Sequence, residues 1–81
     1  ITADFTGQIC ENTDRIATDR SFPPLKENDL IAIMDAGAYG YSMSHNFNTR
    51  PRSAEILLDK SSFKEIRKRE TIENIFSLCD I

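Results

Sequence analysis

Two short stretches of this 81-residue sequence combine side chains that could do chemistry. In the first, Cys10 precedes Glu11. A thiol with a pKa of about 8.5 keeps its proton at neutral pH and can deliver it to a reacting atom, and a carboxylate can bind an ammonium group. In the second, residues 35–40, two glycines and two alanines surround Tyr39, so the backbone can come close to another group. Taken alone, Cys10 and Glu11 are more typical of a buried small side chain and a solvated loop glutamate, and Tyr39 also suits a core position.

Charge and cysteine content argue against several other kinds of site. Thirteen acidic residues outnumber ten basic ones, for a net charge of −3, whereas nucleic-acid-binding modules are usually basic. The basic residues within 64–69 are mixed with Glu65, which indicates a solvated face. Cys10 and Cys79 lie far apart, and His45, assigned to the surface or an interface, is the one histidine. We therefore expect free thiols in a reducing compartment and no metal site.

The elements that would position these residues are mostly strands. Residues 3–10 favour a short strand, and the polar residues 11–24, which end in two prolines, favour a loop. Residues 26–29 are typical of a tight turn. The continuous apolar run at 30–34 then predicts a buried strand.

The C-terminal part of the sequence predicts a hairpin followed by a helix. Residues 54–58 and 63–69 flank a four-residue turn, although the apolar spacing in the second arm also allows a helix. The apolar spacing across 72–79 indicates an amphipathic helix with Thr71 as its N-cap. Cys79 lies on the apolar stripe of this helix, where it would serve packing.

Size and strand number predict an incomplete domain. About four strands are too few to close a barrel, and the sequence does not begin with methionine. No apolar run approaches the roughly 18 residues that a membrane helix needs, and the N-terminus does not resemble a secretory signal. We therefore expect residues 1–81 to be a fragment of a larger, mainly β domain.

Four segments carry longer patterns. Residues 7–14 read G-Q-I-C-E-N-T-D, residues 37–43 read G-A-Y-G-Y-S-M, residues 46–55 read N-F-N-T-R-P-R-S-A-E, and residues 66–71 read I-R-K-R-E-T. The first three are similar to G-P-x-C-E-x-x-D, G-A-Y-G-x-S-M and N-[FY]-N-x-R-P-R-x-A-E of the diaminopimelate decarboxylase family, and the fourth matches a further run of that family. Together, in this order and spacing, they resemble the C-terminal domain of the family.

The resemblance implies a fold-type III enzyme that depends on pyridoxal 5′-phosphate (PLP). It places the chain in the C-terminal, Greek-key-like β-barrel domain of the alanine-racemase and decarboxylase type, with one short C-terminal helix. The N-terminal PLP-binding (β/α)₈ barrel, with its Schiff-base lysine, would be absent from these residues. The implied reaction converts meso-2,6-diaminopimelate to L-lysine and carbon dioxide, the last step of lysine biosynthesis, in a cytoplasmic homodimer. The sequence has four lysines, Lys26, Lys60, Lys64 and Lys68, and none of them lies in the Schiff-base motif of the family.

The resemblance also assigns roles to individual residues. Cys10 matches the proton donor, and Glu11 matches the residue that binds the distal amino group of the substrate. Tyr39 matches the tyrosine that contacts the PLP phosphate and the substrate. In this fold Tyr39 would serve the cofactor of its own chain, whereas Cys10 and Glu11 would reach the site of the partner chain. Loop-anchoring hydrogen bonds are expected from three residues of the third segment: Asn46, Arg50 and Arg52.

The sequence departs from the family pattern at the first loop. Gln8 replaces the usual proline, and residues 12–13 replace a frequent Ser-Gly. The loss of that glycine leaves open which residue of the loop has a left-handed backbone, and Asn12 could supply it. Asn28 replaces a turn glycine and also tolerates the left-handed region.

Three alternatives remain open. A decarboxylase of the same fold acting on ornithine or arginine is the nearest, although ornithine decarboxylases carry Cys-Asp where this sequence has Cys10-Glu11. A small β module that binds a protein partner without catalysis belongs to another class. A nucleic-acid binder is disfavoured by the net negative charge.

Overall fold

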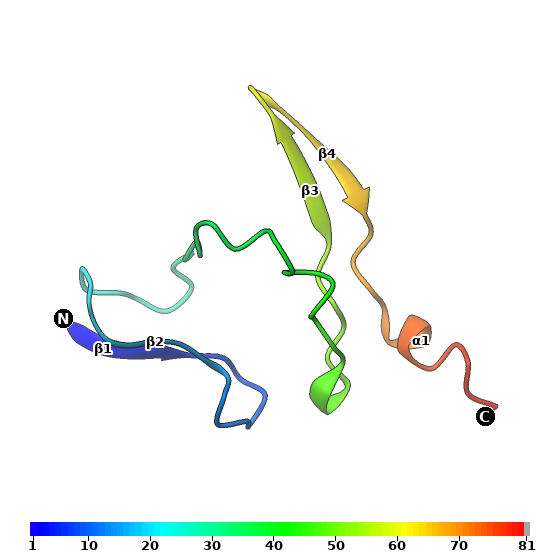
Figure 1. Ribbon diagram of the computed structural model, residues 1–81, viewed down its shortest axis with the longest axis horizontal. Coiled ribbons are helices and arrows are strands. Elements are labelled where there is room, and N and C mark those ends of the chain that lie inside the picture. The colour runs from blue at the N-terminus through cyan, green and yellow to red at the C-terminus, as the bar shows by residue number, and fades with distance from the viewer. Residues whose placement is uncertain (81) are drawn as a thin grey trace. The chain divides into compact units, whose positions relative to one another are not determined.

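The computed structural model describes residues 1–80, which divide into two units. The N-terminal unit, Ile1–Met34, contains strands β1 (Thr2–Thr6) and β2 (Arg15–Ser21). The C-terminal unit, Asp35–Ile81, contains the 3₁₀ turn η1 (Phe47–Thr49), strands β3 (Glu55–Asp59) and β4 (Ser62–Arg67), and helix α1 (Ile72–Ile75). Each strand pair is a separate two-stranded antiparallel sheet (Figure 1). No helix of the described residues is long and apolar enough to cross a membrane.

Strands β1 and β2 form an irregular hairpin. Ala3 pairs with Arg20 and Phe5 with Ala17, so one extra residue of β2 bulges between the two pairs. Asp19 takes a left-handed backbone at this bulge, and its N–H donates to Asp4 Oδ1 over 2.8 Å. The bulge therefore has its own hydrogen bond in place of the missing ladder bond.

The prediction of a loop over residues 11–24 was wrong for its central part. Residues 15–21 form β2, and the predicted strand at 3–10 ends early, at Thr6. The polar sequence of β2 suits a ribbon with solvent on one face, because pairing with β1 satisfies its backbone whatever its side chains are. The two prolines, Pro23 and Pro24, lie beyond the strand, after Phe22, where a missing N–H breaks no ladder bond.

The prediction of a buried strand over residues 30–34 was also wrong. These residues form no strand, and Leu30 is 98% exposed. An open hollow of about 470 Å³ lies against the β1–β2 hairpin and is lined in part by residues 31–34. A buried strand needs hydrogen-bonded neighbours, and no described segment pairs with this run. The turn before it was predicted correctly, with a left-handed Asn28 and a bond from the Asp29 N–H to the Lys26 carbonyl.

The predicted C-terminal hairpin is confirmed, but its turn is tighter than the four residues expected. Asp59 pairs with Ser62, which leaves a two-residue loop, and Lys60 there has a φ of 57°. The second arm is a strand throughout and not the alternative helix. A register shift next to Glu55 brings that residue opposite Arg67, and their side chains form an ion pair of 2.5 Å.

Helix α1 is shorter than predicted. Its N-cap is Thr71, as expected, and a capping box with Asn74 satisfies the first turn. The helix ends at Ile75 and continues as turns, so Cys79 lies on no helical stripe and is exposed. The reason is the lack of a packing surface, because an isolated helix this short is marginal without tertiary contacts.

The architecture is therefore mainly β with few helical residues, as predicted. Neither sheet closes on itself, and none of the described hydrophobic side chains is buried. Hydrogen-bonded loops, rather than an apolar core, hold the candidate residues in these two units.

Candidate functional site

The loop that joins β1 to β2, residues 7–14, is closed by hydrogen bonds at its base. The Gly7 N–H donates to the Asp14 carbonyl over 2.9 Å, and the Asp14 N–H donates to the Glu11 carbonyl over 3.0 Å. The Ile9 N–H reaches Asp14 Oδ2 at 3.4 Å. Asp14 thus contacts the loop with both its backbone and its side chain.

Gly7 is required at the base of this loop for space. A Cβ atom at this position would lie 1.9 Å from Asp14 Oδ2, well inside van der Waals contact. The glycine therefore lets the carboxylate of Asp14 fold over the chain and hold the loop. We call residues 7–14 the Cys-Glu loop.

Cys10 lies in the middle of the Cys-Glu loop with a left-handed backbone. Its φ is 57°, and its thiol is exposed. A non-glycine residue held in this region costs about 1–3 kcal/mol and persists only where the surroundings demand it. The left-handed residue of this loop is therefore Cys10 and not Asn12, which could also have taken that backbone. The strain falls on the candidate proton donor itself.

An open depression of about 390 Å³ lies beside the thiol. Its lining is polar and comes from the loop and the adjoining strand ends: Thr6, Gly7, Cys10, Glu11, Asn12, Asp14 and Arg15. The depression therefore presents the thiol and two carboxylates to a small polar ligand.

Glu11 is held by the residue two positions later. Both the N–H of Thr13, at 2.8 Å, and its hydroxyl donate to Glu11 Oε2. The hydroxyl bond, followed by the two backbone bonds from Thr13 and Asn12, lowers the pKa of Glu11 below its ordinary value. Glu11 is thus ionised at neutral pH, the state in which a carboxylate binds an ammonium group.

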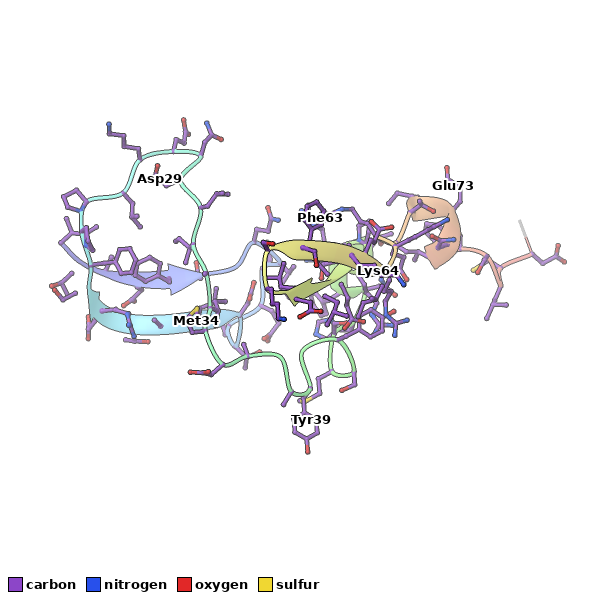
Figure 2. The ribbon with its side chains drawn as sticks, turned by 90° about the horizontal axis from the view of Figure 1, so that it is seen from above. Asp29, Met34, Tyr39, Phe63, Lys64 and Glu73 are labelled. Carbon is purple, nitrogen blue, oxygen red and sulfur yellow. The ribbon has the colours of Figure 1, made fainter. Side chains whose placement is uncertain are left out.

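Tyr39 belongs to the C-terminal unit and also has a left-handed backbone. Its φ is 65° and its side chain is 73% exposed. Figure 2 shows the phenol directed away from the ribbon. The neighbouring residues 36–38 and Gly40 carry nothing larger than a methyl group, and the Tyr39 hydroxyl makes no hydrogen bond within the described residues.

This segment fits the phosphate of PLP by the chemistry of its donors. An exposed phenol with a free O–H can donate to a phosphate oxygen. A Cβ at Gly37 would meet no atom within 4 Å, so a ligand can approach the backbone there. Gly40 has a different role, because a Cβ would lie 2.9 Å from the Ala36 carbonyl oxygen.

The third predicted segment anchors its surroundings, as expected. Asn46 Nδ2 donates to the Arg50 carbonyl and to Glu70 Oε1, and the Arg52 guanidinium donates to Tyr41 O and Ser44 Oγ. Among the bonds given for the described residues, Arg50 takes part through its backbone and not its side chain: its carbonyl accepts from Asn46 Nδ2, and its N–H donates to the Phe47 carbonyl over 3.4 Å. Sequence reasoning gave Glu70 no role, although it lies within the fourth recognised segment.

The structure thus brings Cys10 and Glu11 together on one loop and places Tyr39 in the other unit. His45 is exposed, as predicted, and its ring lies 6.1 Å from that of Phe47. Within residues 1–80 no three His, Cys, Asp or Glu side chains are arranged to hold a metal ion.

Comparison with known proteins shows which proteins this chain is similar to. Residues 1–37 match the family described as pyridoxal-dependent decarboxylase, C-terminal sheet domain. The chain is 47% identical over 74 residues to a diaminopimelate decarboxylase of Pseudomonas aeruginosa, and 44% identical over 72 residues to one of Methanothermobacter thermautotrophicus. These alignments cover 91% and 89% of this chain, but only 18% and 17% of the relatives. The chain therefore spans less than a fifth of the length of either relative.

A solved structure shows the same likeness. The diaminopimelate decarboxylase of Helicobacter pylori, complexed with L-lysine, superimposes with a TM-score of 0.89 at 39% sequence identity. The match covers 95% of this chain and 19% of that chain.

Proposed function

We propose that this chain, whose residues 1–37 match the C-terminal sheet domain of pyridoxal-dependent decarboxylases, is part of a diaminopimelate decarboxylase, the enzyme that it resembles over most of its length. The polypeptide that contains it would convert meso-2,6-diaminopimelate to L-lysine and carbon dioxide. Residues 1–81 would belong to a Greek-key-like β-barrel domain that other residues of the polypeptide complete. The (β/α)₈ barrel and the lysine that bind PLP would lie outside these residues.

The pairing of Cys10 with an ionised Glu11 on one closed loop carries this proposal. PLP, when bound, supplies the electron-withdrawing group that lets the carboxylate leave as carbon dioxide. The Cys10 thiol then gives its proton to the Cα of the substrate, where the carboxylate was. The Glu11 carboxylate binds the distal ammonium group by a charge-assisted hydrogen bond and so selects the length of the substrate.

Tyr39 supports binding of the cofactor. Its phenol donates a hydrogen bond to a phosphate oxygen, and the small residues on either side leave room for the approach. The exposed hydroxyl and the open space at Gly37 favour this role.

We further propose a cytoplasmic homodimer in which each site uses both chains. Tyr39 would bind the cofactor of its own chain, whereas Cys10 and Glu11 would act on the substrate at the site of the other chain. In the described residues, hydrophobic side chains are widely exposed on both units, which supports a surface covered by other parts of the protein.

The test is substrate choice by the complete polypeptide. We expect release of carbon dioxide from meso-2,6-diaminopimelate, dependent on added PLP, and little release from L-ornithine or L-arginine. Glu11→Gln, which keeps the size and removes the charge, should raise KM about tenfold to a hundredfold, as expected for one hydrogen bond between charged groups. Equal release from ornithine, or an unchanged KM in Glu11→Gln, would overturn the assignment.

A further inference from the structure

We propose that Arg52 is a positioning residue for the cofactor-binding tyrosine. Its guanidinium fixes the turn of residues 39–44, and this turn presents Tyr39 to the phosphate of PLP. The inference rests on the proposed function, because it takes the contact between Tyr39 and the phosphate as given.

The first observation is the set of bonds at the far end of the turn. Arg52 Nη2 donates to the Tyr41 carbonyl over 2.7 Å, and Arg52 Nε donates to Ser44 Oγ over 2.8 Å. The Ser44 hydroxyl in turn donates to the same Tyr41 carbonyl over 2.6 Å. A planar guanidinium suits this forked arrangement, because its N–H groups point in fixed directions.

The second observation is that the same turn carries Tyr39. The Met43 N–H donates to the Tyr39 carbonyl over 3.0 Å, and the Ser44 N–H donates to the Tyr41 carbonyl over 2.9 Å. The Tyr41 carbonyl thus accepts bonds from Ser44 N, Ser44 Oγ and Arg52 Nη2. Tyr39 and Tyr41 therefore belong to the same hydrogen-bonded turn.

The third observation is the strain at Tyr39. A bulky residue with a φ of 65° is uncommon and stays in place only when other contacts hold it. Within the described residues, the Tyr39 hydroxyl makes no hydrogen bond, and the side chain is largely exposed. The constraint must therefore come from the backbone of the turn, which Arg52 holds.

Arg52 is itself held firmly. Its N–H donates to Glu70 Oε1 over 2.9 Å, and its carbonyl accepts from the Glu70 N–H over 3.0 Å. Asn46 Nδ2 donates to the same Glu70 oxygen over 2.5 Å. The guanidinium carbon also lies 3.8 Å from the centre of the Tyr41 ring, a cation–π contact. All four of these residues are half-buried, in a unit whose other side chains are mostly exposed.

Arg67 offers a matched control. Its guanidinium carbon also lies 3.8 Å from the centre of the Tyr41 ring, but its Nε donates to Glu55 Oε1, whereas the guanidinium that donates to the Tyr41 carbonyl is that of Arg52. Replacing Arg67 removes a similar charge and a similar ring contact, and it leaves the carbonyl of Tyr41 bonded.

The experiment measures the affinity of the complete apoenzyme for PLP in a double-mutant cycle of Arg52→Gln and Tyr39→Phe. Each single variant should weaken PLP binding about tenfold to a hundredfold, the range for a hydrogen bond to a charged group. The double variant should bind PLP almost as well as the single variant with the lower affinity, because both changes remove the same contact. Arg67→Gln should bind PLP within about twofold of the parent, and Arg52→Lys should recover only part of the affinity.

The outcomes separate the inference from the proposed function. Additive effects in the double variant would mean that Arg52 does not act through Tyr39, and the inference would fail alone. It would also fail alone if Tyr39→Phe weakened binding and Arg52→Gln did not. Unchanged binding in Tyr39→Phe would remove both the contact and the inference. If Arg52→Gln does not fold, Ser44→Ala replaces it in the cycle, because it removes two bonds of the turn and keeps Arg52. Its effect on PLP affinity should be smaller, and the same outcomes support or overturn the inference.

Discussion

Replacing Gly7 by alanine should displace the Cys-Glu loop. The added Cβ would lie 1.9 Å from Asp14 Oδ2, so the carboxylate must move by about 1.5 Å to reach ordinary contact distance. That movement breaks the bond of 3.4 Å between the Ile9 N–H and Asp14 Oδ2. The loop then loses its side-chain attachment to the end of β2, although its backbone bonds can still form.

The size of the effect follows from the bond that is lost. A hydrogen bond to a charged group contributes about 1.5–3 kcal/mol, but this one is long and Asp14 is only half-buried, so about 1 kcal/mol is the better figure. That alone lowers the population of the correct loop about fivefold. Because a misplacement of 1 Å can cost about a hundredfold in rate, kcat of the complete enzyme should fall between fivefold and a hundredfold.

The assay compares kcat of the complete enzyme with Gly7→Ala alone and in an Asp14→Gly background. If the clash is the cause, the alanine should do little further harm once the carboxylate has gone. A kcat within twofold of the parent in Gly7→Ala, or equal harm in both backgrounds, would refute this reasoning.

Three further predictions concern the thiol, the carboxylate and the chain as a whole. Cys10→Ala should lower kcat about 10²–10⁴-fold with little change in KM, since the proton is needed after binding, while Cys79→Ala, the other exposed thiol, should be neutral in the same steady-state assay. Thr13→Val should shift the acid limb of kcat/KM to higher pH. The pKa of Glu11 is lowered, so the contacts of its carboxylate are fully present above the ordinary pKa of a glutamate and are lost as the pH falls through the lowered pKa. Without the Thr13 hydroxyl the pKa of Glu11 is less depressed, so that loss begins at a higher pH. Thr13→Ser should keep the parent profile, and an unshifted limb in Thr13→Val would contradict the role of the hydroxyl. The 81-residue chain made alone should show no cooperative thermal transition by circular dichroism, because none of its described hydrophobic side chains is buried; a sharp melt with a near-ultraviolet signal would count against this.

Features that depend on neighbouring residues could be predicted from the sequence. The turn at 26–29, the hairpin of β3 and β4 and the N-cap Thr71 all formed where expected. Each depends on bonds between residues a few positions apart, so the local residue types are enough to specify it. The same holds for the pairing of Cys10 with Glu11, which are adjacent in the chain.

Features that depend on residues far apart in the chain could not be predicted from the sequence. The polar residues 15–21 form a strand because β1 pairs with them. The apolar residues 30–34 lie outside any sheet because no described strand pairs with them. Periodicity reports which side chains can be buried, but not whether a partner is present to bury them.

The sequence by itself thus determined which chemical groups are present, namely a thiol beside a carboxylate and a tyrosine among small residues. Tertiary structure alone decided how they are held. The left-handed backbones of Cys10 and Tyr39, and the bonds of Glu70 to Asn46 and Arg52, have no local signature in the sequence. The physical reason is that strain at one residue persists only when bonds from others outweigh it, and Glu70 lies 24 and 18 positions from the residues that it joins.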